Sequence, residues 1–329
     1  MNLEENTCNP LNVSEQKNIG RRQFLNKCST CAAGVILLAV PGVTAASKNS
    51  VSILQGLNDI KDAKKIFIKK GTCSQALFFL LNREFGHIKD TEERAIDPLA
   101  GGIMQHGYQC GILWGSAMAA GAESYRRHND QSQAITQSIK ATQQILEAFV
   151  KKTKTANCIE ITNIDFTKRF SMLKAIFNMG DCLRLVDKMA PKLLEVTRES
   201  LSKTPIGLSG QILSCASETV RKMGANDEEM VMVAGFAGGL GLSGNACGAL
   251  SAAIWKNTIS WCRKNPEKSP FFNEDGENTI RVFEEATGSE FLCSKITGKT
   301  FKSISDHTEY IKCGGCEKLI NTLAQTKVS

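Results

Sequence analysis

The sequence lacks several features that would assign it to a familiar functional class. No uninterrupted apolar stretch reaches the 18 or more residues of a bilayer span. No run of five or six like charges accompanies the net charge of +7, so nucleic acid is not an expected partner. Only four histidines occur, and no acid–base pair indicates hydrolysis. What remains is a globular chain of 329 residues with 13 cysteines, long enough for two domains and suggestive of thiol chemistry.

The first 46 residues resemble an export signal. A polar stretch precedes the paired Arg21 and Arg22, and an apolar run follows over residues 32–43. This order is typical of signal peptides, and the arginine pair resembles the twin-arginine signal read by the Tat export machinery. A first helix of the fold fits less well, because the run has no polar face and ends in Pro41-Gly42. The pattern predicts an exported protein, in the periplasm or on the outer face of the cytoplasmic membrane.

The rest of the chain contains one unit written twice. Residues 100–113 align without a gap with residues 237–250, and seven of the fourteen positions are identical. Four cysteines recur in the same register, at intervals of 37, 48 and 24 residues in the first copy and 32, 46 and 23 in the second. The first set is Cys73, Cys110, Cys158 and Cys182, and the second set is Cys215, Cys247, Cys293 and Cys316.

The segments between the cysteines favour helices. Residues 74–85 end at a glycine that is typical of helix stops, and residues 90–93 and 226–229 have N-cap signatures in equivalent places. Apolar residues from 135 to 149 share one face of a helix that begins at Asp130. Period-two alternation is scarce. We therefore expect an all-α fold of two tandem helical repeats, residues 47–200 and 201–329, behind a signal segment of residues 1–46.

These cysteines and the glycine-rich runs before them resemble the C_GCAxxG_C_C family, a group of redox-active proteins with four cysteines. The eight cysteines above fall on the four family positions, once per repeat. Each copy departs from the motif at one place, with Ile112 where the family has Ala and Ala252 where it has Gly. The resemblance implies redox activity, and it names neither a substrate nor a redox partner.

Four cysteines per repeat leave three chemical interpretations open. The first is a thiolate-bound metal or iron–sulfur cluster, because four thiolates complete such sites; all eight cysteines are then ligands. Export of an already folded protein also favours this interpretation. The second is thiol–disulfide exchange, since Cys110, Cys182, Cys247 and Cys316 occur at or near predicted helix starts, where thiolates are favoured. The third is a set of structural disulfides. A covalently attached haem is not expected, because Cys-x-x-Cys-His is absent.

Glycine-rich loops precede the second cysteine of each set. The pairs Gly102 and Gly107, and Gly239 and Gly244, fit G-x-x-x-x-G, but no Lys-Ser/Thr follows and no strand precedes, which excludes a P-loop and a dinucleotide fingerprint. We expect tight turns that lead into the second cysteine and direct backbone N–H groups at its sulfur, with close helix packing as the alternative. Gly111 and Gly248 directly follow the motif cysteines, and we expect them also to let the backbone come close to neighbouring groups. Cys262 and Cys313 stand outside the repeat.

Overall fold

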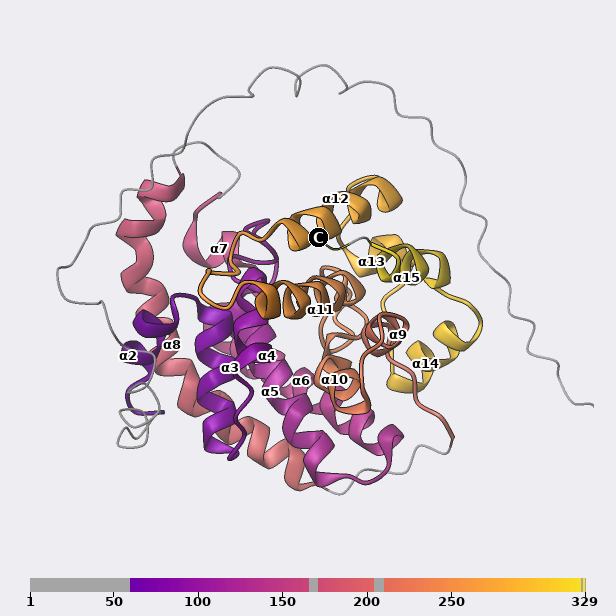
Figure 1. Cartoon of the computed structure of the whole chain (residues 1–329). Coiled ribbons are helices and arrows are strands. Elements are labelled where there is room, and N and C mark those ends of the chain that lie inside the picture. Colours follow the sequence, from indigo (N-terminus) through magenta and orange to yellow (C-terminus); the bar gives the residue numbers. More distant parts are fainter. Residues whose placement is uncertain (1–59, 166–170, 204–209, 327, 329) are drawn as a thin grey trace, which may run out of the picture. The chain divides into compact units, whose positions relative to one another are not determined.

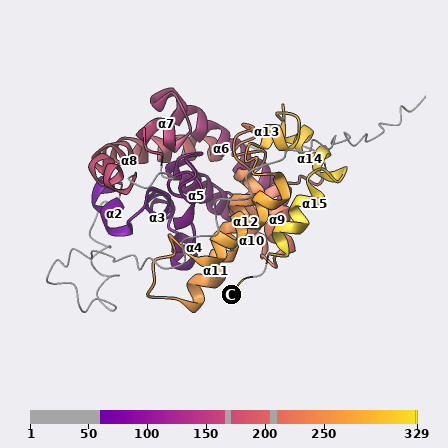
Figure 2. The same ribbon diagram turned by 90° about the horizontal axis from the view of Figure 1, so that it is seen from above.

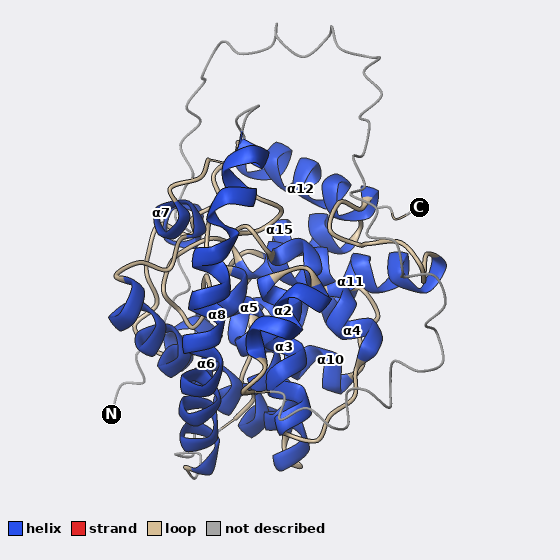
Figure 3. Cartoon of the chain, turned by 90° about the vertical axis from the view of Figure 1, so that its left-hand side faces the viewer, coloured by secondary structure: helices blue, strands red, loops and turns tan. Residues whose placement is uncertain are grey.

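All regular secondary structure in the described residues is helical, as predicted. The computed structural model describes residues 60–165, 171–203, 210–326 and 328 (Figure 1). Within these ranges no strand forms, and extended pairing is limited to two isolated bridges, Gln109 with Asn157 and Ala246 with Leu292. Figure 3 shows helices joined by loops throughout. The two bridges occupy equivalent places in the two repeats, because Gln109 aligns with Ala246.

The two repeats contribute matching series of helices. The first repeat contains α2 (Ala63–Lys70), α3 (Cys73–Glu84), α4 (Asp90–Ala95), η1 (Asp97–Leu99), α5 (Gly111–Arg127), α6 (Gln131–Thr153), α7 (Cys158–Thr162) and α8 (Ser171–Ser202). The second contains α9 (Cys215–Lys222), α10 (Asp227–Met232), η2 (Ala234–Phe236), α11 (Gly248–Lys264), α12 (Glu274–Thr287), α13 (Cys293–Ile296), α14 (Ile304–Lys312) and α15 (Glu317–Ala324). From α3 onward, each element of the first series has a counterpart in the second, except that α14 and α15 together replace α8.

Six of the described helices begin at a capping side chain. Asp130 caps α6 by accepting a hydrogen bond from the backbone N–H of Gln133 at 2.7 Å, and Asn226 forms a capping box with Glu229 on α10. Two predictions were wrong. Asp90 is the first residue of α4 and makes no cap. Cys182 lies inside the long helix α8, so no helix begins there.

The repeats pack against each other through several helices of each. Residues 58–329 form one compact unit, in which α5 contacts α10, α4 contacts α11, and α6 contacts η2. Figure 2 shows the first repeat on one side and the second on the other. Trp114 of α5 is fully buried and meets Phe236 of η2 edge-on, with ring centroids 4.8 Å apart. Trp255 is also fully buried, and its indole N–H donates to the carbonyl of Glu92 in the other repeat.

The predicted export signal, including Arg21 and Arg22, lies outside the described residues. In the part of the chain that the structure describes, no helix is both long enough and apolar enough to cross a membrane.

The contact between repeats predicts a difference between two helical glycines. A Cβ at Gly121 of α5 would lie 2.5 Å from the backbone oxygens of both Val231 and Met232, whereas a Cβ at Gly180 of α8 would meet nothing within 4 Å. Gly121→Ala should therefore lower the free energy of unfolding by about 2–3 kcal/mol, because the backbone there has to move. Gly180→Ala should raise it by about 0.5–1 kcal/mol.

Urea denaturation followed by circular dichroism measures both changes. Equal stabilities of the two variants would show that the close contact between α5 and α10 is absent in solution.

Candidate functional site

Each glycine-rich loop contains five consecutive residues in the left-handed conformation. The φ angles run from 45° to 79° over residues 101–105 and from 57° to 82° over residues 238–242. Five of these ten residues are not glycine, and each costs about 1–2 kcal/mol in this conformation. At Gly102 and Gly239 any Cβ would overlap backbone atoms of Tyr108 and Asn245. Such strain persists only where the surroundings enforce it, and it is common at functional sites.

The left-handed turns place backbone N–H groups at the first cysteine of each set. The N–H of Gly101 donates to the sulfur of Cys73, and the N–H of Gly238 donates to the sulfur of Cys215. The N–H groups of Ser74 and Ala216 add to these bonds. We expected the loop N–H groups at the sulfur of the second cysteine, and this was wrong, because the sulfur that they reach is that of the first.

The same loops hold the third cysteine through backbone hydrogen bonds. The N–H of Cys158 donates to the carbonyl of Tyr108 at 2.6 Å, and the N–H of Cys293 donates to that of Asn245 at 2.7 Å. A Cβ at Gly107 would lie 2.8 Å from the side chain of Ile159, and one at Gly244 would lie 3.0 Å from that of Ser294. The glycines therefore also permit close packing, which was the alternative expectation.

The second cysteine of each set is the N-cap of a long helix. Cys110 precedes α5 and Cys247 precedes α11. A Cβ at Gly111 would lie 2.6 Å from the sulfur of Cys73, so glycine is required for the first two cysteines to approach each other. Gly248 has a different neighbour, because a Cβ there would overlap the backbone of Phe236.

The fourth cysteine differs between the repeats. Cys182 lies in the interior of α8, whereas Cys316 is the N-cap of α15 and has φ of 59°. Cys316 accepts a hydrogen bond from the hydroxyl of Tyr310, and the ring of Tyr310 packs against Gly315. Both fourth cysteines are partly exposed, so each site reaches the surface at this position.

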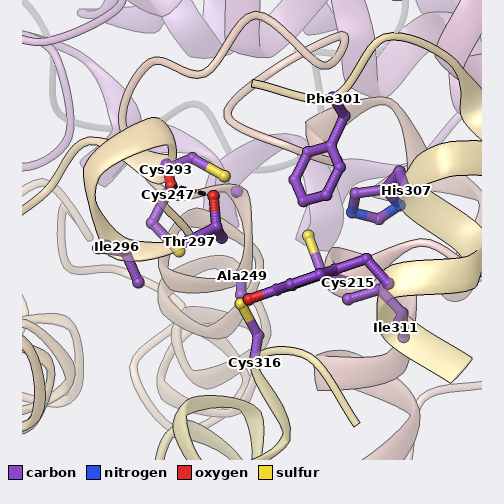
Figure 4. A pocket seen from close by; sticks show the side chains of 12 residues that line it. Cys215, Cys247, Ala249, Cys293, Ile296, Thr297, Phe301, His307, Ile311 and Cys316 are labelled. Atoms are coloured by element: carbon purple, nitrogen blue, oxygen red, sulfur yellow. Dashed lines mark hydrogen bonds between the residues drawn. The ribbon is translucent and has the colours of Figure 1, made fainter. Parts of the chain in front are cut away.

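Within each repeat the four thiols gather at one site. In the first repeat Cys73 and Cys110 are hydrogen bonded to each other, and the thiols of Cys158 and Cys182 lie close enough to be affected by the charge of Cys73. In the second repeat all four thiols line one cavity of about 10 Å³, which has room for about one water molecule. Figure 4 shows Phe301 and His307 on one side of this cavity and Cys247 and Cys293 on the other. All eight cysteines are free thiols.

Burial makes most of these thiols weak acids. Burial raises the pKa of Cys182 and that of Cys247 to about 12, and it also raises the pKa of Cys158, Cys215, Cys293 and Cys316. Cys73 is the exception. The hydrogen bond from the Cys110 thiol lowers the pKa of Cys73 below its ordinary value, and the same bond raises that of Cys110 well above it.

The donor set fits a thiolate-bound metal in number and type, because four soft ligands per site suit zinc or an iron–sulfur cluster. Among the described residues, however, no three His, Cys, Asp or Glu side chains are spaced as ready-made ligands. Metal binding would therefore require the thiols to adjust their side-chain torsions.

The two cysteines outside the repeat do not pair with each other. Cys262 is a free, buried thiol on α11, and burial raises its pKa to about 11. Cys313 follows α14. His106, in the first glycine-rich loop, directs Nδ1 at the carbonyls of Ile103 and Met104 and stacks on Phe291.

Two residues near the second site were not anticipated from the sequence. Tyr310 and His307 both line its cavity, and their positions in the first repeat, counted back from the fourth cysteine, hold Ile176 and Leu173. In the sequence, only a comparison of the segments before Cys182 and Cys316 could have indicated these two residues. That indication is weak, because the segments share little besides the cysteine.

A comparison with known families agrees with the duplication. The family described as "putative redox-active protein (C_GCAxxG_C_C)" matches residues 72–196 and again residues 209–328. No curated protein and no solved structure gives a significant match to the chain.

The bond between Cys73 and Cys110 predicts a pH-dependent reactivity. Cys73 is partly exposed, and its thiolate forms at lower pH than an ordinary thiol because Cys110 donates to it. Cys110→Ala should therefore move alkylation of Cys73 to higher pH. Mass spectrometry after iodoacetamide treatment of reduced, metal-free protein follows this residue over a pH series.

Two further variants give the comparison. Cys110→Ser keeps a hydroxyl donor and should retain most of the effect, and Cys182→Ala removes a neighbouring thiol that makes no such bond. An unchanged Cys73 profile in Cys110→Ala would refute the proposed cause.

Proposed function

Because the chain belongs to the C_GCAxxG_C_C family of redox-active proteins, we propose that each repeat transfers electrons through a metal–sulfur centre held by its four cysteines. The ligands are Cys73, Cys110, Cys158 and Cys182 in the first repeat and Cys215, Cys247, Cys293 and Cys316 in the second. The observation that carries the proposal is the convergence of four thiols from separate helices, twice, in one chain. When bound, an iron–sulfur cluster would supply a one-electron couple.

The surroundings of the thiols support a bound cation. Thiolate charge is costly in a buried site unless a positive group compensates it. Among the described residues that line the second cavity there is no lysine or arginine. His307 is also there, but burial lowers its pKa to about 4, so it is neutral near pH 7. A metal centre would provide the missing positive charge and deprotonate the thiols.

The backbone donors have a further role in this proposal. Hydrogen bonds to ligand sulfur stabilise negative charge there and tune the potential of a cluster. Gly101 and Gly238 supply such bonds from positions that the left-handed turns fix. The chain thus contributes soft ligands, a largely apolar enclosure and oriented N–H groups.

Anaerobic purification tests this proposal. We expect visible absorption together with iron and acid-labile sulfide, and we expect Cys158→Ser and Cys293→Ser each to lose about half of the metal, because each change removes a ligand of one site only. Cys262→Ser is the matched control, since Cys262 is a buried thiol outside both sites. It should retain the full metal content. A colourless, metal-free wild-type protein would overturn the proposal.

A second candidate function is thiol–disulfide exchange at Cys73 and Cys110. It is favoured by one observation, the hydrogen bond that lowers the pKa of Cys73 and raises that of Cys110. In this reaction the Cys73 thiolate attacks a partner's disulfide, and Cys110 then displaces the partner, which leaves as a dithiol. A metal-free protein with a reversible Cys73–Cys110 disulfide would support this function in place of the first.

We also propose that the protein is exported by the Tat route to the periplasm or the outer face of the cytoplasmic membrane. Support comes from the order of residues 1–46 alone, with Arg21 and Arg22 before the apolar run. Insertion of a metal centre before export is consistent with a route that carries folded proteins.

Export has a direct test. Replacing Arg21 and Arg22 together by lysine keeps the charge but removes the paired arginines, and we expect the protein to accumulate in the cytoplasm. Immunoblots of periplasmic and cytoplasmic fractions measure the distribution, with a Lys17→Arg variant as control. Wild-type distribution of the double variant would show that the arginine pair is not read.

A further inference from the structure

The two glycine-rich loops meet at the contact between the repeats, and one buried glutamine joins them. Gln109 directly precedes Cys110 and is fully buried. Its side-chain amide donates to the carbonyl of Gly239 at 3.1 Å and to that of Ala246 at 3.3 Å. Ala246 directly precedes Cys247. One side chain therefore links the residues before the two equivalent cysteines.

An aromatic stack crosses the same contact. The ring of Tyr108 stacks on that of Phe291, with centroids 4.9 Å apart and planes at 21°. The carbonyl of Tyr108 accepts the N–H of Cys158 in the first site, and the carbonyl of Phe291 accepts the N–H of Cys247 in the second. The stack thus connects two residues that are each bonded to a different cysteine site.

Packing alone does not account for Gln109. Its side-chain oxygen, Oε1, is buried and has no hydrogen-bond partner among the described residues. An unpaired buried amide oxygen costs about 1–3 kcal/mol, and the two hydrogen bonds that the same amide donates across the contact offset this cost. The aligned position in the other loop holds alanine, and the link is therefore made from one side only.

We propose that the two cysteine sites exchange electrons directly across this contact, so that the chain acts as a two-electron carrier. The inference rests on the proposed function of each repeat as a one-electron centre. With a centre bound by each set of four cysteines, one electron would pass from the reduced centre to the oxidised one, and no covalent bond would form or break. Gln109, Tyr108 and Phe291 are positioning residues, because they hold the two sites together and touch the bonded backbone rather than a substrate.

The first experiment compares the whole protein with its single-site variants. Electron paramagnetic resonance spectra of the fully reduced wild type should show an interaction that is absent from the sum of the Cys158→Ser and Cys293→Ser spectra. If metal is bound and the wild-type spectrum equals that sum, the direct exchange is overturned while the proposed function stands. If no metal is bound, the direct exchange and the proposed function are both overturned.

The second experiment tests the route. After a flash has reduced one centre, electron redistribution between the centres should be several-fold slower in Gln109→Leu, at unchanged metal content. The matched control is Gln137→Leu. Gln137 lies on α6, is also buried, and donates a hydrogen bond to the carbonyl of Lys203. If Gln137→Leu slows the electron transfer equally, loss of a buried glutamine loosens the protein in general, and the specific role of Gln109 is overturned.

A variant at the aromatic stack covers the case in which Gln109→Leu does not fold. Tyr108 is partly exposed, so Tyr108→Leu should fold and remove the stacking on Phe291. We expect slower redistribution in this variant as well. Wild-type transfer rates in both Gln109→Leu and Tyr108→Leu would overturn the route.

Discussion

The left-handed turn in each glycine-rich loop is the constraint on which the rest of each site depends. It directs the N–H of Gly101 or Gly238 at the first cysteine, offers carbonyl groups to the N–H of the third, and leads directly into the second. Right-handed backbone would turn these groups away. The strain of non-glycine residues such as Ile103 and Leu240 is tolerated because the turn is held by the helices around it.

This constraint also explains why the two repeats form one unit. The loops that build the sites lie at the contact between the repeats, where Gln109 reaches the second loop and Tyr108 packs on Phe291. A Cβ at Gly241 of the second loop would lie 3.1 Å from the backbone of Gln143 on α6, so that loop is supported in turn by the first repeat. Each site is therefore built by its own cysteines and braced by the other repeat.

Much of this arrangement follows from the sequence, because it depends on local rules. Doubled cysteine spacing identified the repeat, capping residues such as Asp130 and Asn226 marked helix starts, and glycines marked the turns. The exceptions depend on distant contacts. Cys182 was expected at a helix start, but α8 continues through it because packing against α3 and α6 stabilises one long helix. The bonds of Gln109 join residues 130 and 137 positions apart, and spacing between cysteines carries no information about them.

The fourth cysteine gives the two sites unequal electrostatic surroundings. In the second repeat Gly314 and Gly315 interrupt the helix, so Cys316 stands at the start of α15 and accepts a hydrogen bond from the Tyr310 hydroxyl. In the first repeat the helix is continuous. Cys182 lies within α8, where its own N–H group is hydrogen bonded inside the helix. Hydrogen bonds to ligand sulfur favour the more negative, reduced state of a metal–sulfur centre. At this one position a bound metal–sulfur centre would be easier to reduce in the second repeat, whereas the bond from Cys110 to Cys73 is particular to the first.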